Sequence, residues 1–123
     1  MKLSIHQPQY IPWISYFIKI SLSDKFILLD TVSFQKNGLQ NRNELKDSNG
    51  RFWLTVPIIQ NFGQKIVEVK INNNANWRSK HFQSLVHCYK KSTFFSKYID
   101  EIEKIYLTDW HNLSDLNISL IYK

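Results

Sequence analysis

The sequence is short of the residues that build cross-linked, metal-bound, membrane-spanning or disordered chains. Its 123 residues include one cysteine, Cys88, which excludes an internal disulfide and a zinc site built from several thiolates. With only three glycines and three prolines, the composition is not that of a disordered chain. No apolar run is long enough to cross a bilayer, and polar residues interrupt the N-terminus before a signal-peptide core could form. We therefore expect a cytoplasmic protein without a membrane span.

What the chain does contain is typical of one globular domain with a basic surface. Hydrophobic residues make up 43% and charged residues 21%, and the length suffices for one hydrophobic core over residues 1–123. The formal net charge of +6 predicts an anionic partner, such as a nucleotide, a phosphorylated sugar or a nucleic acid. The alternative is that the excess lysines only hydrate the surface. They are spread along the chain, which argues against a nucleic-acid-binding tail.

The N-terminal segment 2–19 organises the rest of the chain. Residues 3–5 predict a short strand that stops at the polar loop 6–12, after which a helix runs to Ile20. Pro8 and Pro12 each fix the backbone, and Pro12 suits the first turn of that helix. A strand that turns through a rigid loop onto a helix N-terminus is a common anion-binding corner in α/β proteins.

A second strand is predicted at 25–30, where a continuous apolar run ends in Asp30. Strand, helix and strand within thirty residues indicate a βαβ unit with parallel strands, although a buried helix cannot be separated from a buried strand by periodicity alone. Because parallel strands end at the same edge of a sheet, Asp30 should lie beside the loop that holds His6.

The middle of the chain predicts mainly strands. Residues 31–35 alternate and suggest a short strand, and 43–46 with 51–56 predict a β-hairpin around the turn 47–50. Residues 64–71 alternate almost cleanly and predict an outer strand, although Val67 breaks the period of two.

The last third predicts helices that begin at Trp77 and at Thr93, and a weaker one over 113–121, with a helix N-cap offered within 72–76. We therefore expect an α/β fold: a Rossmann-like or nucleotidyltransferase-like sheet of mainly parallel strands with a β-hairpin insertion and C-terminal helices. The nucleotidyltransferase comparison is an analogy, because the HxGH pattern of those enzymes is missing.

An amide-rich stretch at 36–43 is the candidate anion site. Arg42 stands between Asn41 and Asn43, so a guanidinium fork and amide donors could hold a phosphate or carboxylate, with Lys36 as a second cation. Asn37 and the glycine after it signal a turn. The alternative is an ordinary polar loop.

The candidate catalytic residues lie at the strand ends. His6 could act as a general base or hold a phosphate, because its pKa lies near neutrality; otherwise it is hydrogen bonded into the loop. Asp30 could orient His6 or bind a sugar hydroxyl, or it could cap the next turn. Gln7 and Tyr10 either contact substrate or tie the loop down. His81 could complete the site, although a lone histidine on a helix stripe is more often a core residue.

Tryptophans and metal ligands offer weaker signals. Trp13, Trp53 and Trp77 are expected in the core rather than as platforms for sugar stacking. His6, Asp30 and His81 could in principle hold a metal, but no tight HxH or HxxxH spacing supports a metal site. No motif identifies a cofactor.

Several motifs in order along the chain resemble the WbqC-like family. They are HQPQYIPW at 6–13, NRN at 41–43 and WLTVP at 53–57, followed by Trp77 with His81. The first of these is specific, and the later ones gain weight from their order. Ser15 stands where the family usually has glycine. Family members are longer, so the resemblance implies that this chain is truncated at its C-terminal side.

The resemblance also implies a function. Family members are encoded among bacterial surface-polysaccharide (O-antigen) genes and are regarded as acyl or aminoacyl transferases, with glycine the usual suggestion. It implies a transferase that acts on a nucleotide-linked amino sugar, with an aminoacyl-tRNA as a further partner. The alternatives are a nucleotide- or tRNA-binding module without catalysis, or an inactive truncated remnant. The expected catalytic residues are His6 and Asp30, and the expected substrate-binding residues are Gln7, Tyr10, Lys36, Asn41, Arg42, Asn43 and His81.

Overall fold

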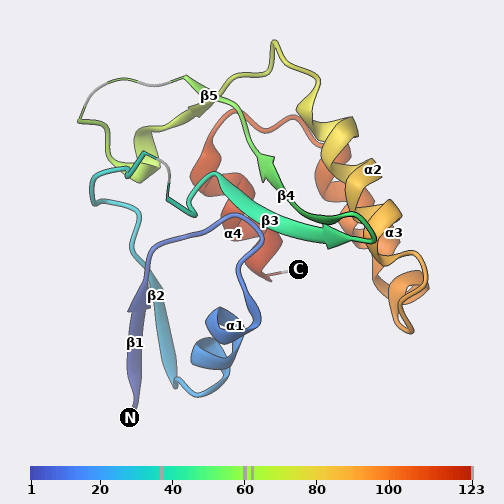
Figure 1. Ribbon diagram of the computed structural model, residues 1–123. Helices are drawn as coiled ribbons and strands as arrows, with labels where there is room; N and C mark the ends of the chain where they lie inside the picture. The colour runs from blue at the N-terminus through green and yellow to red at the C-terminus, as the bar shows by residue number, and fades with distance from the viewer. Residues whose placement is uncertain (37, 60, 62, 123) are drawn as a thin grey trace.

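The hairpin in the middle of the chain packs against a helix from its second half, whereas the N-terminal strand pair lies to one side with the first helix (Figure 1). The computed structural model describes residues 1–36, 38–59, 61 and 63–122, so Asn37 of the expected turn lies outside the described residues. The elements are β1 Leu3–His6, α1 Ile14–Ser21, β2 Lys25–Leu28, β3 Arg42–Asp47, β4 Gly50–Thr55, β5 Ile58–Ile59, the 3-10 helix η1 Ile66–Glu68, β6 Lys70–Ile71, α2 Trp77–Tyr89, α3 Phe95–Leu107 and α4 Leu113–Tyr122.

The predicted βαβ unit is confirmed. β1 and β2 pair in parallel, with His6 opposite Leu28, and α1 connects them. The helix begins at Ile14 rather than at Pro12, so the proline precedes the first turn instead of lying within it. Ile11, just before this proline, has a φ of 46°, a left-handed conformation that is unusual for a β-branched residue. The loop is therefore held in a strained shape.

The expected sheet of mainly parallel strands is not what the described residues form. The strands make three two-stranded sheets, β1–β2, β3–β4 and β5–β6, and only the first is parallel. The physical reason is the length of the connections. A two-residue turn joins β3 to β4, and so short a turn permits only antiparallel pairing. Residues 31–35 contribute an isolated bridge between Ser33 and Lys65 rather than a strand.

The segment 64–71 was expected to be a strand and is mainly a 3-10 turn. Ile66 and Val69 are both fully buried, whereas Val67 between them is 39% exposed. A spacing of three between buried residues matches the 3-10 helix, which has three residues per turn. Only the end of the segment, β6, pairs as a strand, with β5.

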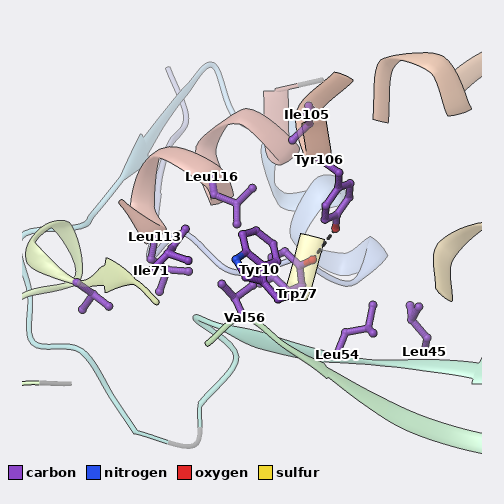
Figure 2. Packing of buried hydrophobic residues seen from close by; sticks show 11 residues of the cluster. Tyr10, Leu45, Leu54, Val56, Ile71, Trp77, Ile105, Tyr106, Leu113 and Leu116 are labelled. Carbon is purple, nitrogen blue, oxygen red and sulfur yellow. Dashed lines mark hydrogen bonds between the residues drawn. The ribbon is translucent and has the colours of Figure 1, made fainter. Parts of the chain in front are cut away.

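The hairpin and the three C-terminal helices are confirmed, and together they enclose the core (Figures 1 and 2). The expected side-chain N-cap of α2 is not present at Asn76. The described residues include no helix long and apolar enough to cross a membrane. The buried cluster comprises Tyr10, Leu45, Leu54, Val56, Val69, Ile71, Trp77, Ile105, Tyr106, Leu113 and Leu116.

Candidate functional site

His6 ends β1 and is half-buried at the start of the proline loop. Its Nδ1 lies 3.0 Å from the carbonyl oxygen of Gln7. Because a carbonyl oxygen only accepts, Nδ1 carries the hydrogen in this contact, and the lone pair of the neutral ring is on Nε2. The ring packs edge-on against Tyr16 at 4.6 Å, and the Tyr16 hydroxyl donates to the same carbonyl of Gln7 at 2.8 Å. The imidazole is therefore fixed in one tautomer that leaves a basic nitrogen.

Asp30 follows β2 at the edge where His6 ends β1, as the parallel register predicts. Its carboxylate is turned toward α4, where Oδ2 accepts a hydrogen bond from the Ser114 hydroxyl at 2.8 Å. Its carbonyl accepts from the Val67 amide at 2.8 Å. No hydrogen bond joins the Asp30 and His6 side chains in the part of the chain that is described. Asp30 thus ties α4 and η1 to the sheet.

Gln40 is a buried amide that the sequence did not single out. It is 3% exposed, its Nε2 donates to the Gln7 side-chain oxygen at 2.7 Å, and its Oε1 accepts from the Gln35 amide at 2.9 Å. Its carbonyl accepts from Asn117 on α4 at 2.7 Å. The His6 corner is therefore physically connected to the amide-rich stretch. The stretch itself was noticed, but nothing in the sequence tells which of its amides points inward.

Tyr10 and His81 belong to a buried hydrogen-bonded chain. The Tyr10 hydroxyl contacts Nδ1 of His81 at 2.7 Å. It also contacts the hydroxyl of Tyr106, and Figure 2 draws this second contact as a dashed line. Nε2 of His81 faces the carbonyl of Thr55 at 3.1 Å and so donates to it. Nδ1 must then accept, which makes Tyr106 donate to Tyr10 and Tyr10 donate to His81. Tyr10 and His81 were both expected to bind substrate, but here they make structural contacts. Their side chains are 0% and 5% exposed, respectively.

Burial sets the ionisation of this chain. Desolvation lowers the pKa of His81 from 6.5 to about 4, against the opposing effect of its bond to the Thr55 carbonyl. Desolvation also raises the pKa of Tyr10, as does the neighbouring Tyr106, so both phenols stay protonated. The three side chains of this hydrogen-bond network, Tyr106, Tyr10 and His81, are therefore all uncharged near pH 7, as burial requires.

Asn43 is likewise a structural residue in this geometry. It is 2% exposed, its Oδ1 accepts from the Trp13 indole at 2.7 Å, and its Nδ2 donates to the carbonyl of Ile11 at 2.6 Å. It therefore anchors the strained loop. Asn41 donates from its side chain to the Val56 carbonyl at 3.1 Å.

The two candidate cations converge on a hollow of about 330 Å³, which we call the Lys36–Arg42 hollow. Arg42 begins β3, its Nε donates to the carbonyl of Gly38 at 3.3 Å, and its guanidinium lies 4.2 Å from the ring centre of Trp53. The hollow is lined by Phe34, Lys36, Asn41, Arg42, Thr55, Val56, Pro57 and Ile58.

The expected catalytic residues do not line the hollow that holds the expected anion-binding residues, because neither His6 nor Asp30 is among its lining residues. Arg42, expected in the amide-rich stretch, lies at the start of β3 on the antiparallel hairpin. Among the described residues no group of three or more histidine, cysteine, aspartate or glutamate side chains could hold a metal.

Two of the three tryptophans expected in the core are exposed. Trp77 is 4% exposed and lies in the core, whereas Trp13 and Trp53 are 59% and 46% exposed. Trp53 was not expected at the site, although its place one residue before a buried leucine on an alternating strand could have indicated it.

Comparison with known proteins supports the motif resemblance. The model of the WbqC-like protein family matches residues 7–123 of this chain. The chain is 38% identical over 123 residues to the uncharacterized protein Rv1507c of Mycobacterium tuberculosis, a match that spans 98% of this chain and 53% of the relative. The chain thus spans about half the length of this curated relative. No solved structure matches closely enough to serve as a comparison. On the extent of these matches, the chain belongs to the WbqC-like protein family.

Proposed function

We propose that the chain binds a phosphate-bearing small molecule in the Lys36–Arg42 hollow. The observation that carries this proposal is the meeting of two cationic side chains at one hollow of about 330 Å³, a size typical of a small-ligand site. A guanidinium and an ammonium are suited to phosphate, the first as a planar fork and the second as a point charge. The net charge of +6 would attract such a ligand.

The reaction we propose is acyl or aminoacyl transfer, glycine being the suggested group, to a nucleotide-linked amino sugar in the cytoplasmic steps of surface-polysaccharide assembly. The sugar amine would attack the acyl carbonyl, so that the new C–N bond forms as the bond to the leaving group breaks. Nε2 of His6, which the Gln7 contact leaves with a lone pair, would take the amine proton. Gln40 supports this assignment by joining the His6 corner to the segment that carries Asn41 and Arg42.

The fold contributes one more argument. The β1–α1–β2 unit is one parallel strand pair joined by a helix, a connection that nucleotide-binding α/β proteins also use, so it favours a nucleotide by analogy. We therefore propose a nucleotide rather than a simple sugar phosphate as the carrier.

Binding is tested first, with inorganic pyrophosphate and isothermal titration calorimetry. Replacing Lys36→Met or Arg42→Gln removes one charge-assisted contact, so each should weaken binding by about tenfold or more. Lys104→Met removes a charge from the exposed face of α3 and should leave the affinity unchanged. Equal affinities for wild type, Lys36→Met and Arg42→Gln would show that the hollow is not the anion site.

Catalysis is tested separately. The protein is incubated with nucleotide-linked amino sugars and activated acyl donors, and the mass of the sugar product is followed. His6→Ala should abolish transfer while pyrophosphate binding persists, because His6 does not line the hollow. If His6→Ala transfers the acyl group as fast as wild type, His6 is not the base.

A further inference from the structure

An exposed tryptophan lies next to the Lys36–Arg42 hollow. Trp53 is in the middle of β4, and its outward-facing side chain is 46% exposed, while its neighbours Phe52 and Leu54 face inward. Single exposed apolar residues are common and carry no meaning alone. This one is distinguished by its contact with Arg42, which lines the hollow.

Arg42 joins the ring to the hollow. Its guanidinium packs on the Trp53 ring at 4.2 Å from the ring centre, and Arg42 also lines the hollow. Thr55, two residues after Trp53 on the same face of β4, pairs with Arg42 across the hairpin and lines the hollow as well. Trp53 itself does not line the hollow, and the Arg42 guanidinium covers one face of its ring, so a ligand bound to Arg42 could reach the other face of the ring.

The acidic residue on this face of the hairpin, Glu44, lies close to an arginine. Glu44 pairs directly across from Trp53, and its carboxylate lies 3.8 Å from the guanidinium of Arg51, which is two residues before Trp53 on the same face of the hairpin. Carboxylates accept hydrogen bonds from sugar hydroxyls, so Glu44 fits a ligand that carries a ribose between its ring and its phosphate.

We propose that Trp53 stacks the base of a nucleoside phosphate whose phosphate occupies the Lys36–Arg42 hollow. This rests on the proposed function and specifies it: the outer face of the β3–β4 hairpin recognises a nucleotide rather than any phosphate. Stacking on an aromatic ring is tolerant of base identity, so the ring selects for a nucleoside and the hollow selects for its phosphate.

The experiment compares two ligands on matched variants. Wild type should bind uridine and adenosine diphosphates more tightly than inorganic pyrophosphate, by about tenfold or more in calorimetric Kd. Trp53→Ala should remove that difference and leave pyrophosphate affinity unchanged, whereas Trp53→Phe, which keeps a ring, should retain most of it. Phe94→Ala removes another exposed aromatic ring, one that does not line the hollow, and should alter neither affinity. Thermal melts confirm that each variant is folded.

Each other outcome overturns a defined statement. If pyrophosphate binds but the nucleotides bind no better, the stacking proposal fails, while the proposal that the hollow binds a phosphate-bearing molecule stands. If Trp53→Ala weakens pyrophosphate as much as the nucleotides, the ring only positions Arg42, and the stacking proposal again fails. If neither ligand binds, both proposals fail.

A nucleoside phosphate can come from a free nucleotide or from an RNA end, and salt separates these sources. Binding of a transfer RNA should fall steeply with salt because many phosphates are contacted, whereas binding of a nucleoside diphosphate should respond weakly. Tight transfer-RNA binding that is lost in Trp53→Ala identifies RNA as the source of the base, and nucleotide binding without it identifies the free nucleotide.

Discussion

At the scale of single residues, His81 is a buried group whose protonation opposes folding. It is 5% exposed, and both ring nitrogens are committed, one to the Tyr10 hydroxyl and the other to the Thr55 carbonyl. Protonation would place a second hydrogen on the nitrogen that must accept from Tyr10 and would put a charge into the core. The family motif therefore includes a histidine that supports the fold here.

The first prediction is that His81 makes stability depend on pH between 6.5 and about 4. The pKa of His81 is lowered in the folded protein to about 4, so the unfolded chain takes up the proton first as the pH falls from 6.5. Stability therefore decreases through this interval, by about 3 kcal/mol at most, and His81 adds no further loss below it. Urea unfolding between pH 4 and pH 8 measures this slope.

The variant for this test is His81→Gln, which can accept from Tyr10 and donate to Thr55 without titrating. It should be less stable near pH 7 by about 1 kcal/mol and should show a flatter slope below pH 6.5. His87→Gln removes an exposed histidine from the same helix and should keep the wild-type slope. An unchanged slope in His81→Gln would contradict the assignment.

At the scale of elements, the 3-10 helix η1 shows how a nearly alternating pattern can mislead. Ile66 and Val69 are buried three residues apart, and Val67 between them is 39% exposed. A strand would have placed Val67 and Val69 on the same face, because side chains alternate along a strand. The same substitution made at Val67 and at Val69 therefore distinguishes the 3-10 helix from a strand.

The second prediction is that Val69→Thr destabilises the protein and Val67→Thr does not. The substitutions are chemically identical, but the first buries a hydroxyl and should lower the free energy of unfolding by about 1–3 kcal/mol. The second lies on the surface and should change it by less than about 0.5 kcal/mol. Urea denaturation of both variants provides the comparison, and equal losses would favour the strand.

Local elements were predictable from the sequence, and their assembly was not. The β1–α1–β2 unit, the hairpin and the three helices follow from periodicity and turn signals, and the structure contains all of them. Whether strands join one sheet depends on pairings between distant segments, which no local pattern encodes. The described strands pair only two by two, and the β1–β2 pair alone is parallel, so the expected sheet of mainly parallel strands did not form.

The candidate site was predictable to the same partial extent. Lys36 and Arg42 were expected as cations, and the structure brings both to one hollow. Trp53 was missed because the face on which a hairpin residue lies depends on register, and a shift by one residue reverses it. Gln40 was missed because burial of one amide among several is decided by contacts with Gln7 and Asn117, which are distant in sequence.

At the scale of the whole molecule, an apolar groove lies between the helices. The groove consists of two adjoining hollows of about 330 and 490 Å³, which share Ile11, Leu85, Tyr98 and Ile102. Phe94, just before α3, lines the larger hollow and is 65% exposed. An open apolar surface of this kind should be detectable in the native state.

The third prediction is that the groove binds the dye 1-anilinonaphthalene-8-sulfonate, and that Phe94→Asp weakens this binding by about tenfold, because a phenyl contact is lost and a carboxylate is placed in an apolar hollow. Leu22→Asp is the matched control: Leu22 is also 65% exposed and does not line the groove, and the substitution changes the net charge equally. Any effect of net charge on the anionic dye is therefore the same in both variants, and only a change within the groove can separate them. Dye fluorescence is titrated at pH 7 on protein whose unfolding transition is intact. Equal affinities for the two variants would mean that the dye binds elsewhere and that side chains close the groove in solution.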